Sequence, residues 1–293
     1  MSIIYSDLYY EDLLYESKAI VPPAAVIAGI LSATVVAATP FVGASTGSAR
    51  IGVAMLNEDG ESRKVLNADR RFAMCSTFKF LAVAAVMRRV DRGEDNLDRF
   101  VRYDDRDILA WAPVTKQHLG EGGMTLEALC FAAIAYSDNT AANLILQTLG
   151  GPAAVTSYAR SLGDEITRLD RTEPDLNNVA HGDDRDTTSP AAMLHDMQKI
   201  FRGDALSVSM RDKLESWLMQ NTTGDAMIRA GVPRDWRVGD KTGQNQTGNS
   251  NDIGIILRPD GRAVLLCVYV DAPGASIERR AKMIEDVTRE LVH

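Results

Sequence analysis

The chain has 293 residues, of which 45% are hydrophobic and 25% charged, the balance of a soluble globular protein rather than a solenoid, a collagen or a disordered chain. The formal net charge of −8 argues against a protein whose main partner is nucleic acid, because such proteins present a basic surface. Three cysteines are too few for a disulfide framework. The four histidines form no close ligand pair and no glycine-rich phosphate motif occurs, so we expect neither a metal nor another cofactor.

Residues 1–44 form an amino-terminal segment that we set apart from the fold. Its apolar stretch over residues 19–42 follows Lys18 and is succeeded by small residues. A buried helix and a membrane anchor are two interpretations of this pattern, and a cleaved secretory signal is the third. We favour the signal, although the residues before Lys18 are acidic. The expectation is a periplasmic or secreted protein with no stable membrane partner.

The first half of the remaining chain predicts one hairpin and then helices. Apolar, partly β-branched residues at 51–56 and a returning strand at 62–66 flank the turn signal Asn57–Gly60. Apolar residues at helical spacing predict a helix from Ser76 to Val90. Further helices are predicted at 126–135, 140–149, 152–161, from 190 onward and at 209–219, and a long polar loop at 168–189.

The last part of the chain returns to strands. Three strands are predicted, followed by a helix that Ser276 caps and that reaches Val292; the strands cover residues 236–241, 253–257 and 264–270. The predicted fold is α/β, with a five-stranded antiparallel sheet built from both chain ends and an inserted all-α domain. The sheet domain takes residues 45–68 and 220–293, and the all-α domain takes 69–219. A cleft between two such halves is a common place for a ligand.

Ser76-Thr77-Phe78-Lys79 stands at the predicted start of a helix. Residues three apart on a helix share a face, so Lys79 can approach the Ser76 hydroxyl. A serine becomes a nucleophile when a nearby base takes its proton, and a lysine is a base only when burial or another cation keeps it neutral. The pattern alone is weak, because about one such spacing is expected by chance in a chain of this length.

Two further motifs have both a structural and a functional interpretation. Ser137-Asp138-Asn139 between two helices is a good helix cap, or it turns a hydroxyl and an amide into a cleft. Lys241-Thr242-Gly243 ends a strand. Its glycine is an ordinary turn residue, or it lets a ligand approach the backbone while the lysine and the threonine bind an anionic group.

The three motifs in this order resemble the serine β-lactamases and penicillin-binding proteins. The segment from Glu173 to Asn177 is similar to the loop of class A β-lactamases that carries the deacylating glutamate. Further residues match the family over about Ile51 to Val292. They are Arg171 and Asp186, which close this Ω-shaped loop over 171–186, Asn143, which supports it, and Trp111, an aromatic at the mouth of the cleft.

The resemblance implies a division of labour among the catalytic residues. Ser76 would attack the β-lactam carbonyl and become acylated, and Lys79 would take its proton directly or through Glu173 and a water. Ser137 would pass a proton to the departing ring nitrogen. Glu173 and Asn177 would hold the water that hydrolyses the acyl-enzyme.

The resemblance also implies the binding residues. Asn139 would bind the side-chain amide of the substrate, Lys241 and Thr242 would hold its carboxylate, and Gly243 would also contact the substrate. The backbone N–H groups of Ser76 and Gln244 would form the oxyanion hole. Many class A enzymes have an arginine shortly after the lysine motif, but Ser250 stands there. We therefore expect Arg279 or Arg280, from the last helix, to replace it.

The expected function is hydrolysis of penicillins or cephalosporins by a monomer, which confers antibiotic resistance. Two alternatives share the serine and the lysines: a penicillin-binding D,D-peptidase and a β-lactam-sensing receptor domain. Both lack the glutamate loop, so Glu173 with Asn177 favours the hydrolase. Val83 and Asn245 stand where family members with a disulfide have a partner for Cys130 or Cys75, so we predict neither bridge.

Overall fold

The structure is a computed structural model that describes residues 34–35, 49–57, 59–60, 63–180 and 182–292. The predicted signal over residues 1–44 lies outside these residues except for Thr34 and Val35. Within the described ranges, no helix combines the length and the apolar character that crossing a bilayer requires.

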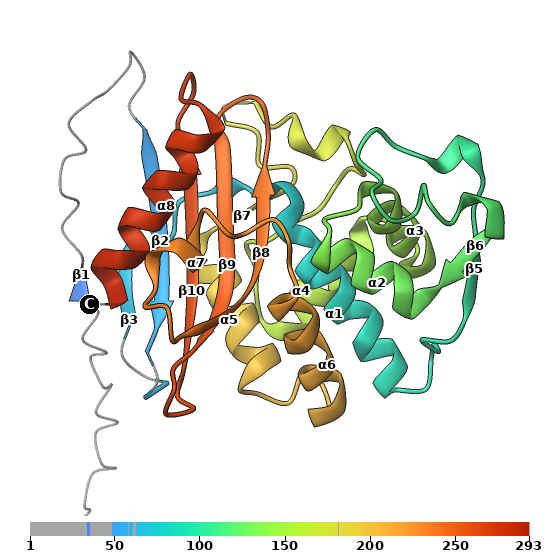
Figure 1. Ribbon diagram of the computed structural model, residues 1–293, viewed down its shortest axis with the longest axis horizontal. Coiled ribbons are helices and arrows are strands. Elements are labelled where there is room, and N and C mark those ends of the chain that lie inside the picture. The colour runs from blue at the N-terminus through green and yellow to red at the C-terminus, as the bar shows by residue number, and fades with distance from the viewer. Residues whose placement is uncertain (1–33, 36–48, 58, 61–62, 181, 293) are drawn as a thin grey trace, which may run out of the picture. The chain divides into compact units, whose positions relative to one another are not determined.

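A mixed sheet contains the five antiparallel strands that the sequence predicts (Figure 1). At its edge, β1 pairs in parallel with β3 and adds a two-residue strand that was not predicted. The antiparallel strands lie in the order β3-β2-β10-β9-β8. The strand bounds are β1 (Thr34–Val35), β2 (Arg50–Leu56), β3 (Arg63–Leu66), β8 (Arg237–Gln244), β9 (Asn249–Leu257) and β10 (Ala263–Asp271).

The centre of the sheet joins the two ends of the described chain. Strand β2 pairs with β10 so that Leu56 lies opposite Leu265 and Arg50 opposite Asp271. Alternate residues of each strand point to opposite faces, and both faces are buried. Leu265 belongs to the core on the helical side and Leu266 to a second core on the other side, beneath α8 (Ile277–Val292). The sheet is therefore a middle layer between helices.

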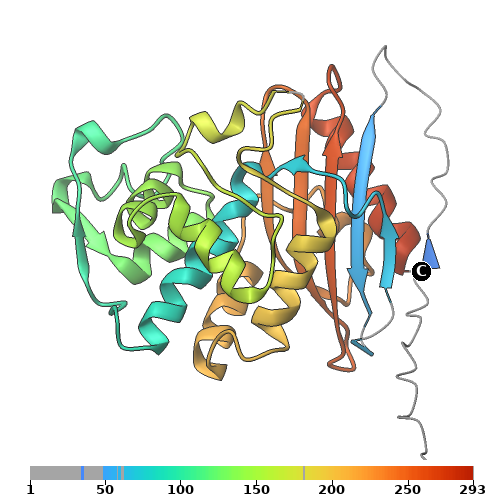
Figure 2. The same cartoon turned by 180° about the vertical axis from the view of Figure 1, so that it is seen from behind.

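The helices on the other face follow the sequence predictions within two residues (Figure 2). The predicted helix start at Ser76 is a 3-10 turn, Cys75–Thr77, which continues into α1. Residues 78–87 of α1 are all buried, so this helix is the centre of the helical layer. These helices are α1 (Phe78–Asp91), α2 (Leu126–Ala135), α3 (Asn139–Leu149), α4 (Ala153–Leu162), α5 (Pro190–Phe201) and α6 (Val208–Met219). A short helix, α7 (Ile228–Gly231), was not predicted, and its Ile228 belongs to the second core beneath α8.

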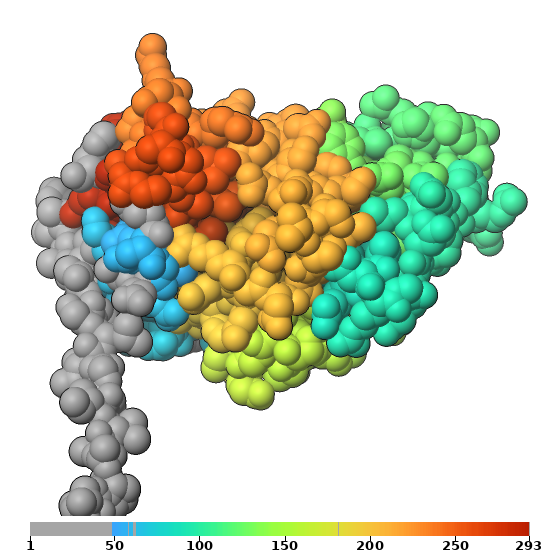
Figure 3. Space-filling view, turned by 90° about the horizontal axis from the view of Figure 1, so that it is seen from below, coloured from blue at the N-terminus to red at the C-terminus, as the bar shows by residue number. Residues whose placement is uncertain are grey.

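Two small ladders connect loops that the sequence leaves irregular. Strand β4 (Phe72–Ala73) pairs with β7 (Thr187–Thr188), and β5 (Phe100–Arg102) pairs with β6 (Gly123–Thr125). The first ladder holds the segment before Ser76 against the end of the predicted loop, and so brings that loop to the nucleophile. In Figure 3, α5 and α6, yellow to orange, fill the surface between β2 and β3 in blue and the teal residues after α1. The division into a sheet domain and an all-α domain remains our proposal.

Candidate active site

Ser76 lies in the tight turn that opens α1. Its neighbour Cys75 has φ of 47°, in the left-handed region that non-glycine residues rarely adopt, so the turn is locally strained. Hydrogen bonds from the sheet hold this turn in place. The Asn251 side chain on β9 donates to the carbonyls of Ala73 and Met74, at 2.8 and 3.0 Å. The sheet thereby fixes the backbone that presents the serine hydroxyl.

Lys79 lies one helical turn after Ser76 and is fully buried. Its Nζ donates to Ser76 Oγ at 2.9 Å and to Asn139 Oδ1 at 2.6 Å, and it forms an ion pair with Glu173 Oε1 at 3.2 Å. Burial lowers the pKa of the Lys79 ammonium, and the charge of Glu173 opposes this effect. A lysine in this position can exchange a proton with the serine.

The Ser137-Asp138-Asn139 motif both caps a helix and turns polar side chains toward the cavity. Asp138 caps α3, because its Oδ1 accepts from Ala141 N at 2.8 Å, and its Oδ2 accepts from Thr115 N at 2.9 Å. Ser137 has φ of 54°. With Asp138 anchored on two sides, Ser137 and Asn139 are held facing Lys79, whose Nζ lies 3.3 Å from Ser137 Oγ.

Lys241 reaches Ser137 from the sheet side. Its Nζ donates to Ser137 Oγ at 3.0 Å and to Thr242 O at 2.8 Å. Burial, with the charge of Lys79 second, lowers the pKa of Lys241 to about 7. Two residues on, Gly243 allows β8 to approach the nucleophile turn, since a Cβ there would lie 2.7 Å from a backbone oxygen and 2.9 Å from Ser76 N.

Glu173 is buried and held by its backbone as well as its side chain. Asn143 donates to Glu173 O and accepts from Glu173 N, both at 2.9 Å. The carboxylate accepts from Asn177 Nδ2 at 2.7 Å and from Ser76 Oγ at 3.3 Å. One carboxylate therefore reaches both the nucleophile and an amide on its own loop.

The two ends of the Ω-shaped loop meet at Asp186. This buried carboxylate pairs with the Arg171 guanidinium and accepts from the backbone N–H groups of Asp170 and Arg171 at 2.7 and 2.9 Å. Arg171 also donates to Asn178 O at 3.0 Å. These bonds close the loop from which Glu173 projects.

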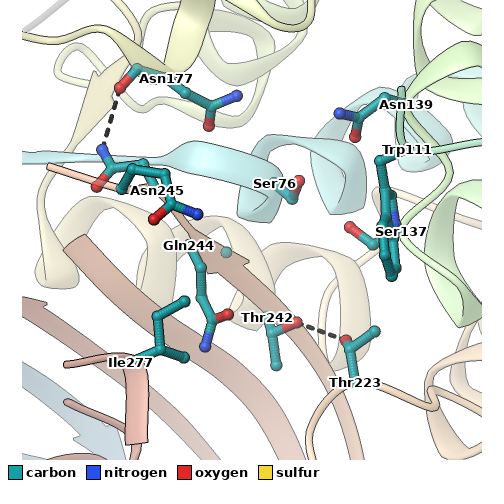
Figure 4. Close-up of a pocket in the computed structure, with 12 residues that line it drawn as sticks. Ser76, Trp111, Ser137, Asn139, Asn177, Thr223, Thr242, Gln244, Asn245 and Ile277 are labelled. Atoms are coloured by element: carbon teal, nitrogen blue, oxygen red, sulfur yellow. Dashed lines mark hydrogen bonds between the residues drawn. The ribbon is translucent and has the colours of Figure 1, made fainter. Parts of the chain in front are cut away.

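A cavity of about 380 Å³ opens over these groups (Figure 4). Ser76 lies near the middle of the view, with Trp111 and Ser137 on one side and Asn177 and Asn245 on the other. Trp111 is 55% exposed and donates through Nε1 to Tyr136 O at 3.2 Å. The lining residues are Ser76, Trp111, Ser137, Asn139, Asn177, Thr223, Thr242, Gly243, Gln244, Asn245, Gln246 and Ile277.

Neither Arg279 nor Arg280 of the last helix lines the cavity. Arg279 is exposed on α8 and is not among the residues that line the cavity. Its neighbour Arg280 is buried, and its guanidinium donates to Asn245 O and Asn249 O at 3.2 Å, so it supports the turn between β8 and β9. The register of α8 instead brings Ile277 to the cavity.

Sequence reasoning missed four lining residues: Thr223, Asn245, Gln246 and Ile277. None lies in a recognisable motif, because each is placed by a turn or a helix end rather than by a local pattern. All three cysteines are free and buried. Among the residues that the structure describes, no three histidine, cysteine or acidic side chains are grouped so that they could hold a metal ion.

Comparison with known proteins agrees with this geometry. The model of the "Beta-lactamase enzyme family" matches residues 36–293. β-Lactamase OXY-2 of Klebsiella oxytoca is 44% identical over 80% of this chain and 81% of its own, and β-lactamase L2 of Stenotrophomonas maltophilia is 45% identical over 82% and 79%.

Solved structures give the same assignment. An ancestral class A β-lactamase (GNCA) superposes with a TM-score of 0.81 and 50% identity, covering 83% of this chain and 93% of that one. The putative class A β-lactamase PenP from Rhodopseudomonas palustris gives a TM-score of 0.80 at 46% identity, with 83% and 93% covered. With its nucleophile turn, paired lysines and glutamate loop, the chain belongs to the class A β-lactamases.

Proposed function

We propose that the protein hydrolyses the β-lactam amide bond of penicillins and cephalosporins through an acyl-enzyme on Ser76, and thereby confers antibiotic resistance. One observation supports this mechanism above the others: Glu173 lies 3.3 Å from Ser76 Oγ and 2.7 Å from Asn177 Nδ2. A carboxylate between the nucleophile and a second polar group is what hydrolysis of a serine ester requires, because the attacking water needs a base.

In the first step, Ser76 Oγ attacks the β-lactam carbonyl carbon. Its proton passes to Lys79 Nζ, 2.9 Å away, or through a water to Glu173. The backbone N–H groups of Ser76 and Gln244 stabilise the oxyanion, and a donor of this kind is worth about a hundred- to a thousandfold in rate. The C–N bond then breaks, and the ring nitrogen takes its proton from Ser137. Ser137 Oγ lies 3.3 Å from Lys79 Nζ and 3.0 Å from Lys241 Nζ, so a lysine can restore that proton.

In the second step, Glu173 removes a proton from a water that Asn177 also binds, and the resulting hydroxide attacks the ester carbonyl. The C–O bond to Ser76 breaks, and Ser76 Oγ takes the proton that Glu173 removed from the water, since the two groups lie 3.3 Å apart. The closed loop matters here, because the Arg171–Asp186 pair and the two hydrogen bonds between Asn143 and the Glu173 backbone hold the carboxylate within reach of the ester.

The substrate is oriented by groups on three sides of the cavity. Asn139 binds its side-chain amide, and Trp111 packs against it at the exposed rim. Lys241 and Thr242 face its carboxylate, and the absence of a side chain on Gly243 leaves room for the ring beside β8.

The peptidase and receptor alternatives have no base for the second step, and the compared relatives are named β-lactamases. We propose a monomer in the periplasm or outside the cell.

Turnover of nitrocefin by the purified protein tests this function. We expect sustained hydrolysis that Ser76→Ala abolishes, since Ser76 Oγ is the hydroxyl that contacts both Lys79 and Glu173. Absence of hydrolysis by correctly folded wild-type protein, or equal turnover by Ser76→Ala, would contradict the proposal.

A further inference from the structure

The carboxylate end of the cavity is built without an arginine. None of the described residues that line the cavity is an arginine, and Arg280 is bound to the backbone of a turn. Two hydroxyls occupy this end instead. Thr223 and Thr242 face one another there, as Figure 4 shows, with their Oγ1 atoms 2.5 Å apart.

The direction of these hydrogen bonds follows from Asn221, which is buried. Its Nδ2 donates to Asp240 Oδ2 at 3.0 Å, and its Oδ1 accepts from Thr223 N at 3.1 Å and from Thr223 Oγ1 at 2.8 Å. A flipped amide would place its oxygen against a carboxylate and its NH₂ against an N–H, so this orientation is fixed. Thr223 gives its only proton to Asn221, and Thr242 must therefore donate to Thr223.

The backbone of this segment is held as tightly as its side chains. Asp240 pairs with Arg229, and a Cβ on Gly224 would lie 1.6 Å from Asp240 Oδ2. The chain thus crosses directly over a buried ion pair, at a point where only glycine fits. Thr223, the preceding residue, is consequently positioned by the ion pair on one side and by Thr242 on the other.

We propose that Thr223 is a substrate-binding residue, whose hydroxyl binds the carboxylate of the β-lactam together with that of Thr242, in place of the missing guanidinium. This inference rests on the proposed function. When the substrate enters, both hydroxyls rotate about their C–O bonds toward the carboxylate. Asn221 Oδ1 keeps its bond from Thr223 N, so no buried polar group loses its last partner. Two neutral bonds are exchanged for two charge-assisted ones.

The experiment compares benzylpenicillin with its neutral methyl ester in the wild-type protein and in Thr223→Val, which keeps the shape of the side chain without its hydroxyl. We expect the ratio of the two kcat/KM values, acid over ester, to fall about tenfold or more in Thr223→Val, the worth of one hydrogen bond to a charged group. Thr223→Ser, which keeps the hydroxyl, should retain the wild-type ratio. Thr222→Val is the matched control, because the neighbouring hydroxyl donates to Ala135 O at 2.9 Å and does not line the cavity.

An unchanged ratio in Thr223→Val would overturn the inference, and so would an equal loss for both substrates, which indicates a merely structural role. If Thr223→Val does not fold, the same acid-over-ester ratio is measured in Thr223→Ser and Thr223→Ala. We then expect the ratio to fall in the alanine variant and to stay at the wild-type value in the serine variant. Failure of the wild-type protein to hydrolyse either compound would instead refute the proposed function, before any comparison of variants.

Discussion

Replacing Glu173 with glutamine should separate the two chemical steps. The carboxylate is buried and touches three groups: Lys79 Nζ at 3.2 Å, Ser76 Oγ at 3.3 Å and Asn177 Nδ2 at 2.7 Å. Glutamine fills the same space without the charge and without a basic oxygen. Lys79 keeps hydrogen bonds to Ser76 and Asn139, so the nucleophile stays in place.

The size of the effect differs between the steps. Loss of a general base is worth about a hundred- to ten-thousandfold, and deacylation should lose that factor, since no other described carboxylate reaches Ser76. Acylation should lose far less. The charge of Glu173 raises the pKa of Lys79, so its removal lets burial lower that pKa further and increases the neutral, basic form.

The assay is rapid mixing with benzylpenicillin, followed by mass spectrometry of the intact protein. We expect a burst near one equivalent, an adduct on the peptide that contains Ser76, and then almost no turnover. Asp175→Asn is the control, an exposed carboxylate two residues away on the same loop, and it should behave like the wild type. Steady-state hydrolysis by Glu173→Gln within tenfold of wild type would refute Glu173 as the base.

Three further predictions concern the supports of the site. Gly243→Ala places a methyl group 2.7 Å from a backbone oxygen, so kcat should fall about a hundredfold, whereas Gly120→Ala, with open space around it, should be neutral in the same assay. Lys241 has its pKa lowered from 10.5 to about 7, so kcat/KM for benzylpenicillin should decline as the pH rises through about 7, and a flat profile to pH 9 would contradict a charged anchor. Asp186→Asn removes a buried charge partner and should lower the free energy of unfolding by about 3 kcal/mol in urea titrations, while Asp183→Asn, in a surface pair, should leave it unchanged.

The helices and the main strands could be predicted because their signals are local. Thr125, Ser189 and Ser207 cap α2, α5 and α6 directly before apolar runs. Gly150 ends α3 with φ of 96°, as a glycine at that place predicts. The residues of the three motifs could be identified as a set because their order along the chain resembles that of a known family. No pattern in the sequence predicts the distances between their side chains.

The remainder depends on contacts between distant segments. Thr223 reaches the cavity because Asn221 binds Asp240 on β8. No local pattern in the sequence predicts this contact. The guanidinium of Arg280 is bound by the backbone carbonyls of Asn245, directly after β8, and Asn249, at the start of β9. The ladders β4–β7 and β5–β6 are two or three residues long, too short to show an alternation. Prediction therefore fails where a side chain's direction is decided by a partner far along the chain.

The pairing of β2 with β10 also constrains the order of folding. Arg50 and Asp271, which bind one another across this ladder, are 221 positions apart. Contacts between residues so distant in sequence form slowly, because a long loop must close before they contribute. During synthesis, β2 has no central partner until β10 has been made. A ribosome that stops before residue 263 leaves β2 without β10 at one edge and without α8 over one apolar face, a target for proteases or aggregation rather than a partly active enzyme.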